Sequence, residues 1–274
     1  MAGILIVIPA RYHSSRLPGK PLRLIAGVPM VERVARVAAA VRGESGDRAY
    51  VVATDHEEIR EFCASRGLPV VMTPATCRDG TERCRFAAEA AREKPRLVVN
   101  LQGDNPLCPP WVLSALIRAW EEEPDAAVYT PCVRLDWEAY DALVEAKRTT
   151  PFSGTTVLVD KNFHALAFSK AILPVVRRQE EARRLSPFSP VLRHVGLYAY
   201  TFEALTRHAT LEVSPYERGE VEGLEQMRFL YNALPVKVVE VDYRGRETSG
   251  GVDSEEDIAR VEAILAKYGE LDAG

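Results

Sequence analysis

Apolar and polar positions follow two alternating patterns over the first hundred residues. Residues 3–9 form a continuous run of branched apolar side chains that ends at a proline, which is typical of a strand covered on both faces of a parallel sheet. Residues 29–41 instead repeat apolar side chains every three or four positions, which predicts an amphipathic helix. The same alternation predicts further strands at 50–53, 70–72 and 96–101, and further helices at 57–66 and 80–93. This order favours an open α/β sheet with helices on both faces.

The second half of the chain has a different pattern. Strands are predicted at 127–133, 155–159, 166–168, 196–200 and 236–241, with less regular helical spacing between them. A closing amphipathic helix is predicted at 254–268, capped by Ser254. The charge run 177–184 has no apolar stripe, so we expect a solvated helix or a mobile loop there. No Gly/Ser linker separates the halves, which indicates one domain of 1–274 with an inserted lobe.

Composition narrows the class of protein. The chain has 274 residues and a formal net charge of −4, which gives no electrostatic footprint for a nucleic acid polymer. No apolar run approaches the roughly 18–20 residues that a membrane span needs. The five cysteines are odd in number and show no CxxC pairing, which argues against both a disulfide framework and a thiolate zinc site. These features predict a cytoplasmic protein with reduced thiols.

Basic side chains gather in the loop that follows the first predicted strand. Arg11, Arg16 and Lys20 lie within residues 9–21, and ligands of open α/β sheets bind at the carboxyl ends of strands. Arginine, lysine and main-chain N–H groups are the donors that a polyphosphate requires. The spacing matches neither a Walker A loop nor GxGxxG. A basic, solvated turn is the alternative interpretation.

Two aspartates are candidate metal ligands. Asp104 follows the predicted strand 96–101, and Asp253 follows two glycines that let the main chain approach a ligand closely. Such carboxylates suit a divalent cation beside phosphates. Each could also be a turn or helix-cap residue.

Taken in order, the motifs resemble those of a known enzyme family. They are IPARYHSSRLPGKPL, VVATDHEEI, RDGTER, VVNLQGDNP, AFSKAILP, RHVGLYAY, GLEQMRFL and SGGVDSEEDI. Their order and spacing resemble 3-deoxy-manno-octulosonate (KDO) cytidylyltransferase, the CMP-KDO synthetase of lipopolysaccharide biosynthesis, from about Ile4 to Leu265. The resemblance implies a Mg²⁺-dependent transferase that uses CTP and an anionic, sugar-acid-like acceptor, commonly as a homodimer. It also implies a mixed, mostly parallel, Rossmann-like nucleotidyltransferase sheet with a smaller inserted α+β lobe. The nucleotide-binding core would comprise about 1–125 and 235–274, and about 126–234 would bind the acceptor and dimerise.

The resemblance also implies roles for particular residues. The nucleotide would be bound by Ala10, Arg11, Arg16, Lys20, Gly80, Thr81 and Gln102. The acceptor would be bound by Gln102, Lys170, His194, Tyr198, Glu225 and Gln226. Asp104 and Asp253 would hold the metal, and Arg11, Lys20 and Asp104 would be catalytic.

Departures from the family pattern cluster on the acceptor side. Asn105 stands where the family usually has glutamate, Thr156 replaces a lysine, and Lys170 replaces an arginine. A single lysine contact in place of an arginine fork would cost a bound carboxylate about one charge-assisted hydrogen bond, roughly 1.5–3 kcal/mol. The segment 216–223 is also about two residues longer than usual. KDO, an amino-substituted KDO and a small phosphonate therefore remain alternative acceptors, and a non-catalytic nucleotide-binding regulator remains a rival function.

Overall fold

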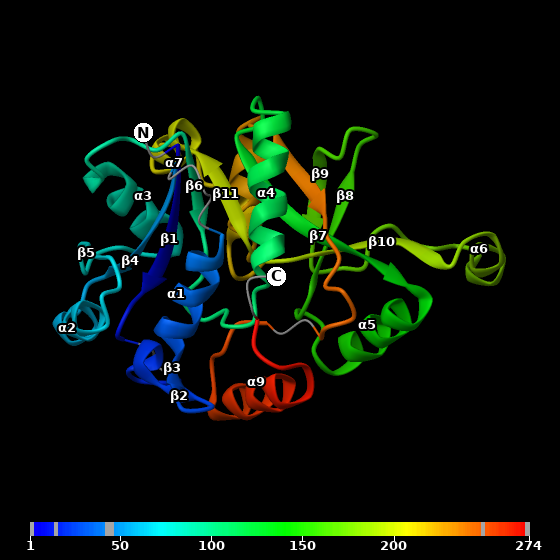
Figure 1. Cartoon of the computed structure of the whole chain (residues 1–274). Coiled ribbons are helices and arrows are strands. Elements are labelled where there is room, and N and C mark those ends of the chain that lie inside the picture. The colour runs from blue at the N-terminus through cyan, green and yellow to red at the C-terminus, as the bar shows by residue number, and fades with distance from the viewer. Residues whose placement is uncertain (1–2, 14–15, 42–46, 248–249, 272–274) are drawn as a thin grey trace. The chain divides into compact units, whose positions relative to one another are not determined.

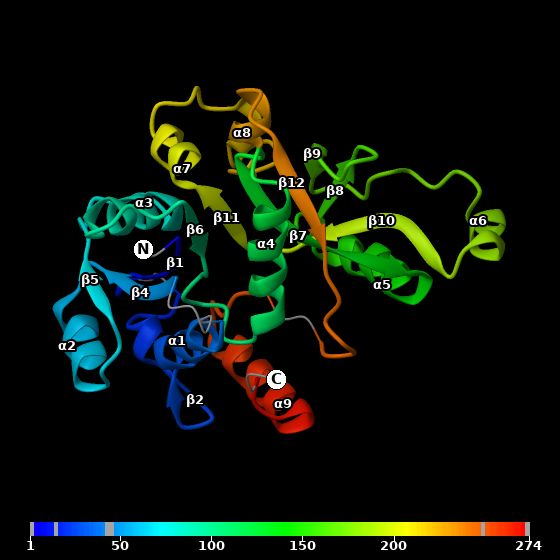
Figure 2. The ribbon, with the colours of Figure 1, turned by 45° about the horizontal axis from the view of Figure 1, so that its top comes forward.

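The computed structural model describes residues 3–13, 16–41, 47–247 and 250–271. Its helices and strands are labelled in Figures 1 and 2. The chain divides into two compact units. The first comprises Met1–Ser114, Ala199–Thr206 and Tyr243–Gly274, and the second comprises Ala115–Tyr198 and Arg207–Asp242. The predicted division into core and acceptor lobe, at about 125 and 235, stays a prediction.

The first unit contains parallel strands in the order β5-β4-β1-β6. Their bounds are Val70–Met72 for β5, Arg48–Thr54 for β4, Ile4–Ala10 for β1 and Leu97–Asn100 for β6. Ile6 of β1, for example, pairs with Tyr50 on one side and Val99 on the other. The central strands are almost wholly buried, as the continuous apolar runs predict. Their carboxyl ends all point to the same edge of the sheet.

Helices cover both faces of these strands. The helices are α1 (Met30–Ala40), α2 (Glu57–Ser65) and α3 (Gly80–Ala90). Figure 2 shows α3 on one face and α1 and α2 on the other. The small hairpin of β2 (Leu24–Ile25) and β3 (Val28–Pro29) precedes α1. Helix α9 (Glu255–Tyr268) begins with the predicted cap, in which the Ser254 side chain accepts from the Asp257 N–H and the Asp257 carboxylate accepts from the Ser254 N–H.

The second unit is built on strands of mixed direction. Antiparallel pairs join β7 (Val128–Asp136), β10 (Phe188–His194), β8 (Thr155–Val159) and β9 (Ala165–Ser169), whereas β12 (Val236–Glu240) lies parallel to β7. Helices α5 (Trp137–Thr149), α6 (Gln179–Leu185) and α8 (Met227–Tyr231) belong to this unit. Between them, the units contain the predicted mixed, mostly parallel sheet with helices.

Three elements link the units along the chain. Helix α4 (Pro110–Glu122), strand β11 (Tyr198–Thr201) and helix α7 (Phe202–His208) each include residues of both units. Short 3-10 helices occur at Lys20–Leu22 (η1) and Pro215–Glu217 (η2).

Several predicted boundaries need correction. Helix α3 ends at Ala90 rather than at residue 93, because Ala91 already has extended backbone and Pro95 follows it closely. The run 177–184 forms the exposed helix α6, in which Arg183 lies over the Trp137 ring and pairs with Asp141. Helices α4 and α5 and strand β10 were not predicted.

Two expectations about the chemistry of the chain can be compared with the structure. The five cysteines are free and buried. Within the described ranges, no helix has both the length and the apolar character needed to cross a bilayer.

Candidate active site

The first candidate segment leaves strand β1 at Ala10 and turns back on itself. Gly19 has a positive φ of 66°, a conformation that favours glycine. Its N–H donates to the Tyr12 carbonyl at 3.2 Å, which closes the loop ahead of η1. This turn places Lys20 beside the carboxyl end of the sheet. Ser14 and Ser15 of the same motif lie outside the described residues.

The second segment leaves the adjacent strand β6. A Cβ at Gly103 would lie 2.3 Å from the Pro9 carbonyl oxygen, so a side chain there would force the two backbones apart. Glycine therefore allows this loop to pass directly against the end of β1, with Asp104 next to the first loop. The Gln102 side chain donates to Asn100 Oδ1 at 3.0 Å.

The third segment is fastened to the second by its main chain. The Val252 N–H donates to the Asp104 carbonyl at 2.8 Å. A Cβ on Gly251 would lie 3.2 Å from the Asp104 carboxylate. Glycine at position 251 thus leaves space for the Asp104 carboxylate. Ser249 of this motif lies outside the described residues.

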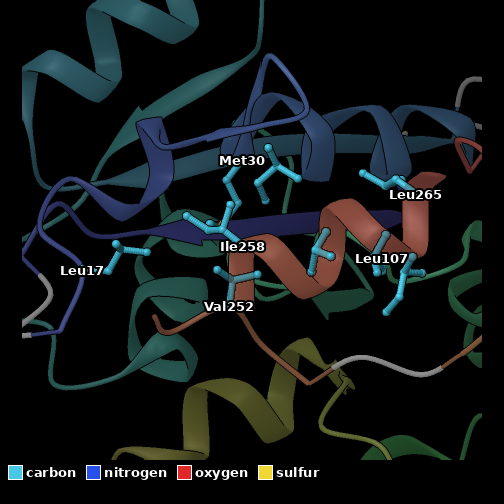
Figure 3. Packing of buried hydrophobic residues seen from close by; sticks show 9 residues of the cluster. Leu17, Met30, Leu107, Val252, Ile258 and Leu265 are labelled. Carbon is cyan, nitrogen blue, oxygen red and sulfur yellow. The ribbon is translucent and has the colours of Figure 1, made fainter. Parts of the chain in front are cut away.

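A hydrophobic cluster beneath these segments holds two of them in place. Leu17 and Val252 are buried in it with Met30 and with Ile258 and Leu265 of α9, as Figure 3 shows. Burying a Leu or Val side chain contributes about 1.5–3 kcal/mol. Leu17 and Val252 are adjacent in sequence to Arg16 and Asp253. Their burial in the cluster therefore restricts the positions of these two polar residues.

The polar side chains of the three segments meet around one ammonium group. Lys20 Nζ lies 2.7 Å from Asp104 Oδ2 and 3.0 Å from Asp253 Oδ1. Arg16 adds a contact of 3.0 Å to the other oxygen of Asp253. Two carboxylates that would otherwise repel each other are brought together by these cations.

A cavity of about 330 Å³ opens onto this cluster. Six of the seven residues predicted to bind the nucleotide line it: Ala10, Arg11, Arg16, Lys20, Gly80 and Gln102. The seventh, Thr81, is buried, with its Oγ1 3.4 Å from the Tyr200 hydroxyl. The structure therefore places Thr81 behind the cavity wall.

The amino-terminal end of α3 also reaches the cavity, through Asp79 and Gly80. Asp79 caps the helix by accepting from the Glu82 N–H at 2.7 Å. The helix dipole and the first N–H groups of such an end favour phosphate. Asp79, where the family motif has serine, keeps the capping function.

Arg83 is a lining residue that sequence reasoning did not single out. It is buried and donates to Asp55 at 2.8 Å and to Thr73 Oγ1 at 2.5 Å. Its place within the RDGTER motif was the available signal. Arg78 and Cys77 also line the cavity.

The acceptor residues predicted in the second unit form a polar cluster of their own. Lys170 Nζ donates to Thr155 Oγ1 at 3.1 Å. His194 Nε2 lies 2.8 Å from Thr130 Oγ1, and its ring lies 5.6 Å from the ring of Tyr198. Burial, together with the smaller effect of the nearby Lys170 charge, lowers the pKa of His194 to about 3. His194 is therefore a neutral side chain and adds no positive charge for an anionic acceptor.

The remaining predicted acceptor residues precede helix α8. Burial and the Glu225 carboxylate raise the pKa of Tyr198, so Glu225 faces the same cluster. Glu225 also lies 3.5 Å from His208. Gln226 is buried at the start of α8. Gln102 belongs to the first unit and lies with the nucleotide residues.

Comparison with known proteins now decides the family. A family model described as cytidylyltransferase matches residues 5–240. A 3-deoxy-manno-octulosonate cytidylyltransferase of Maricaulis maris is 43% identical over 98% of this chain and 99% of its own length. The chain belongs to the cytidylyltransferase family. Its relatives of this name include one from Neisseria gonorrhoeae, 38% identical over 97% of this chain and 99% of its own length.

A solved cytidylyltransferase has the same fold. It is a CMP:2-keto-3-deoxy-manno-octonic acid synthetase in complex with CTP, which is 31% identical to this chain and superimposes with a TM-score of 0.80. The match covers 96% of this chain and 98% of that one. The matched part of the chain therefore includes both units.

Thr156, one of the departures from the family pattern, has a local structural explanation, whereas the contacts of Asn105 within the described residues are made by its main chain, so nothing explains asparagine there. The Thr156 hydroxyl donates to the Ala171 carbonyl at 2.7 Å and accepts from the Leu173 N–H at 3.1 Å, so it fastens the chain after β9. The Asn105 N–H donates to the Gln102 carbonyl within a turn. Arg193 is the neighbour of His194 on strand β10, and consecutive strand residues face opposite sides. Arg193 and His194 therefore face opposite sides of the sheet.

Proposed function

We propose that this protein transfers CMP from CTP to KDO and releases pyrophosphate. The observation that carries the proposal is the meeting of Lys20, Asp104 and Asp253 at a cavity that also receives Arg11 and the start of α3. Cationic side chains and helix N–H groups suit a triphosphate. Paired carboxylates suit a cation that bridges phosphates. A regulator that only binds nucleotide has no need for the carboxylate pair.

The reaction is a displacement at the α-phosphorus of CTP. The anomeric hydroxyl of KDO attacks that phosphorus, and the bond to the β-phosphate oxygen breaks. Arg11, Arg16 and Lys20 would neutralise the charge that gathers on the pyrophosphate as it leaves. Such chemistry is accelerated mainly by positioning and by fixed charge, so no covalent nucleophile is assigned. Arg16 and Lys20 would release their aspartate partners when the triphosphate binds.

The residues present also fit a Mg²⁺ ion. Asp104 and Asp253 supply hard carboxylate oxygens, and among the described residues no group of three or more metal-binding side chains occurs. Mg²⁺ commonly takes one or two carboxylates and completes its shell with water and substrate phosphates. We assign Asp104 and Asp253 as its protein ligands. When bound, the ion would lower the pKa of the attacking hydroxyl and neutralise phosphate charge.

The acceptor cluster suits a KDO-like acid. Lys170 offers a cation for the carboxylate, and the neutral His194, Tyr198 and Gln226 offer hydrogen-bonding groups for hydroxyls. A product of this kind, an activated sugar acid, is a donor for lipopolysaccharide assembly.

Pyrophosphate release tests the activity directly. The purified chain should release pyrophosphate from CTP and KDO with Mg²⁺, at a kcat/KM of about 10⁴ M⁻¹s⁻¹ or more. UTP, GTP and ATP in place of CTP should be poor substrates, and EDTA should stop the reaction. Amino-substituted KDO and small phosphonates serve as competing acceptors. Higher kcat/KM with one of them would overturn the choice of KDO, and no turnover with any would favour the regulator.

We also propose a homodimer formed through the second unit. Val175 precedes the exposed helix α6 and Leu185 is its last residue, and 77% and 80% of their surfaces are accessible. Arg178 and Glu181 beside them pair with each other at 3.3 Å, and in a dimer with a two-fold axis each could also meet the opposite charge of the second copy. Light scattering should give twice the chain mass, and Leu185→Glu should give the monomer. A monomeric native protein at working concentration would remove the proposal.

A further inference from the structure

Glu222 makes contacts that its position in the long segment 216–223 did not suggest. One carboxylate oxygen accepts from the Ser169 hydroxyl at 2.8 Å, and the other accepts from the Lys170 N–H at 2.7 Å. Both oxygens thus bind the two residues where β9 ends. Hydrogen bonds to an ionised carboxylate are roughly twice as strong as neutral ones. Glu222 therefore holds this turn firmly.

Lys147 of α5 holds the same turn through different atoms. Its Nζ donates to the Lys170 carbonyl at 2.5 Å and to the Ser153 and Gly154 carbonyls at 2.7 and 3.0 Å. The main chain of Lys170 is consequently fixed at its N–H by Glu222 and at its carbonyl by Lys147. The Lys170 side chain extends from this fixed point to Thr155.

The charges around Lys170 do not all act in one direction. Burial lowers the pKa of Lys170, and Glu222 raises it. Lys147 carries a like charge, and His194 is neutral. Among these titratable neighbours, Glu222 is the group that favours the ammonium form.

We propose that Glu222 is a positioning residue for the acceptor, which holds the turn of Ser169 and Lys170 through hydrogen bonds and supplies a negative charge near Lys170. The inference rests on the proposed function, in which Lys170 meets the acid group of the acceptor. It assigns a purpose to the segment 216–223, because that segment delivers Glu222 to the turn. Glu222 acts through Lys170 and is not itself a catalytic residue.

Two substitutions separate charge from geometry. Glu222→Gln removes the charge and leaves an amide whose NH₂ group faces a donor, so the KM for KDO should rise about tenfold or more. The KM for CTP should change less than twofold, because the nucleotide residues lie in the first unit. The alkaline limb of kcat/KM for KDO should move to lower pH, since Lys170 loses the carboxylate that raises its pKa. Glu222→Asp keeps the charge, so its alkaline limb should stay near that of the native enzyme.

A matched control and a chemical readout complete the experiment. Glu220→Gln removes the same charge from an exposed residue two positions away and should leave both KM values and the pH profile unchanged. Acetic anhydride at limiting dose, followed by peptide mass spectrometry, should modify Lys170 faster in Glu222→Gln than in the native chain. Exposed Lys161 is the internal standard for this rate.

The outcomes distinguish this inference from the proposed function. A native chain that releases no pyrophosphate with CTP and KDO contradicts the function, whereas the Lys170 labelling rate still tests the contact. An active native chain whose Glu222→Gln variant keeps the native KM for KDO and the native alkaline limb overturns the inference. If Glu222→Gln does not fold, an unchanged KM for KDO in the folded Glu222→Asp variant, whose shorter side chain cannot span both donors, overturns it equally.

Discussion

The ammonium group of Lys20 lies 2.7 Å from the carboxylate of Asp104, across 84 positions of sequence. Each residue follows a parallel strand of the same sheet, β1 or β6, and adjacent parallel strands bring their carboxyl ends together. Lys20 binds Asp253 as well, so one cation pairs with two carboxylates. Binding of a triphosphate and of Mg²⁺ would exchange these partners, with lysine going to phosphate and the carboxylates to the metal.

Removing either carboxylate charge should nearly abolish turnover. Asp104→Asn and Asp253→Asn should each retain less than a tenth of the native kcat/KM, a loss greater than about 1.4 kcal/mol. Both aspartates are partly exposed, so their thermal unfolding should stay close to that of the native chain. Asp125→Asn, at an exposed position, is the control. Activity above a tenth would show that the changed residue is not an essential ligand.

The two consecutive glycines before Val252 should differ in their tolerance of a methyl group. A Cβ on Gly251 meets the Asp104 carboxylate at 3.2 Å, whereas a Cβ on Gly250 meets nothing within 4 Å. Gly251→Ala should therefore displace Asp104 and lower kcat/KM at least tenfold. Gly250→Ala should stay within about twofold of native. Equal effects of the two substitutions on steady-state kinetics would refute this account.

His194 should make the fold sensitive to acid. Its pKa is lowered to about 3 in the folded chain, against about 6.5 in the unfolded chain. The unfolded state therefore binds the proton first, so the stability that the neutral ring contributes is present above about pH 6.5 and falls as the pH drops toward 3. Between pH 6.5 and 5 the loss should be about 2 kcal/mol.

Urea unfolding at several pH values measures this dependence. A His194→Gln variant starts less stable at neutral pH because it disturbs a packed ring, but its free energy of unfolding should decline less steeply over the same range. Parallel slopes for the native and variant chains would mean that His194 does not remain neutral in the fold.

Cys77 should report on nucleotide binding independently of turnover. It lines the cavity, while Cys63, Cys84, Cys108 and Cys132 are each at most 1% exposed. Burial raises the pKa of Cys77 and raises that of Cys108 to about 12, so all thiols should react slowly with iodoacetamide.

Mass mapping should find Cys77 alkylated before the other four, and CTP with Mg²⁺ should slow that step severalfold. A Cys77→Ser chain should lose the early modification. Protection by ATP as strong as that by CTP would speak against selection of the cytosine base.

Local patterns predicted the first unit well because its strands are continuous apolar runs and its helices repeat apolar residues every three or four positions. The apolar run of β1 and the Ser254 cap of α9 both appear where expected. Helix α4 was not predicted, although its sequence, PWVLSALIRAWEE, has helical spacing, with the polar residues Ser114, Arg118 and Glu122 four positions apart. Strand β10 was missed because Pro190 and a bulge between Phe188 and Leu192 interrupt its alternation.

The residues of the candidate site also fall into those that the sequence predicted and those that it did not. Arg11, Lys20, Asp104 and Asp253 were identifiable because they follow apolar strands or glycines. The contact of Glu222 with Ser169 and Lys170 was not, since it joins segments 53 and 52 positions apart through a loop that carries no periodic signal. The neutral state of His194 depends on burial, which no local pattern of one residue reveals.

The packing of Leu17 and Val252 against α9 has a consequence for synthesis of the chain. A growing polypeptide that has already left the ribosome as far as β6 can assemble its parallel strands, but it lacks both Asp253 and the apolar face of α9 that seats the first loop. Leu17 therefore gains this packing only when residues 250–268 emerge. Chains truncated before residue 250 should therefore not consume CTP.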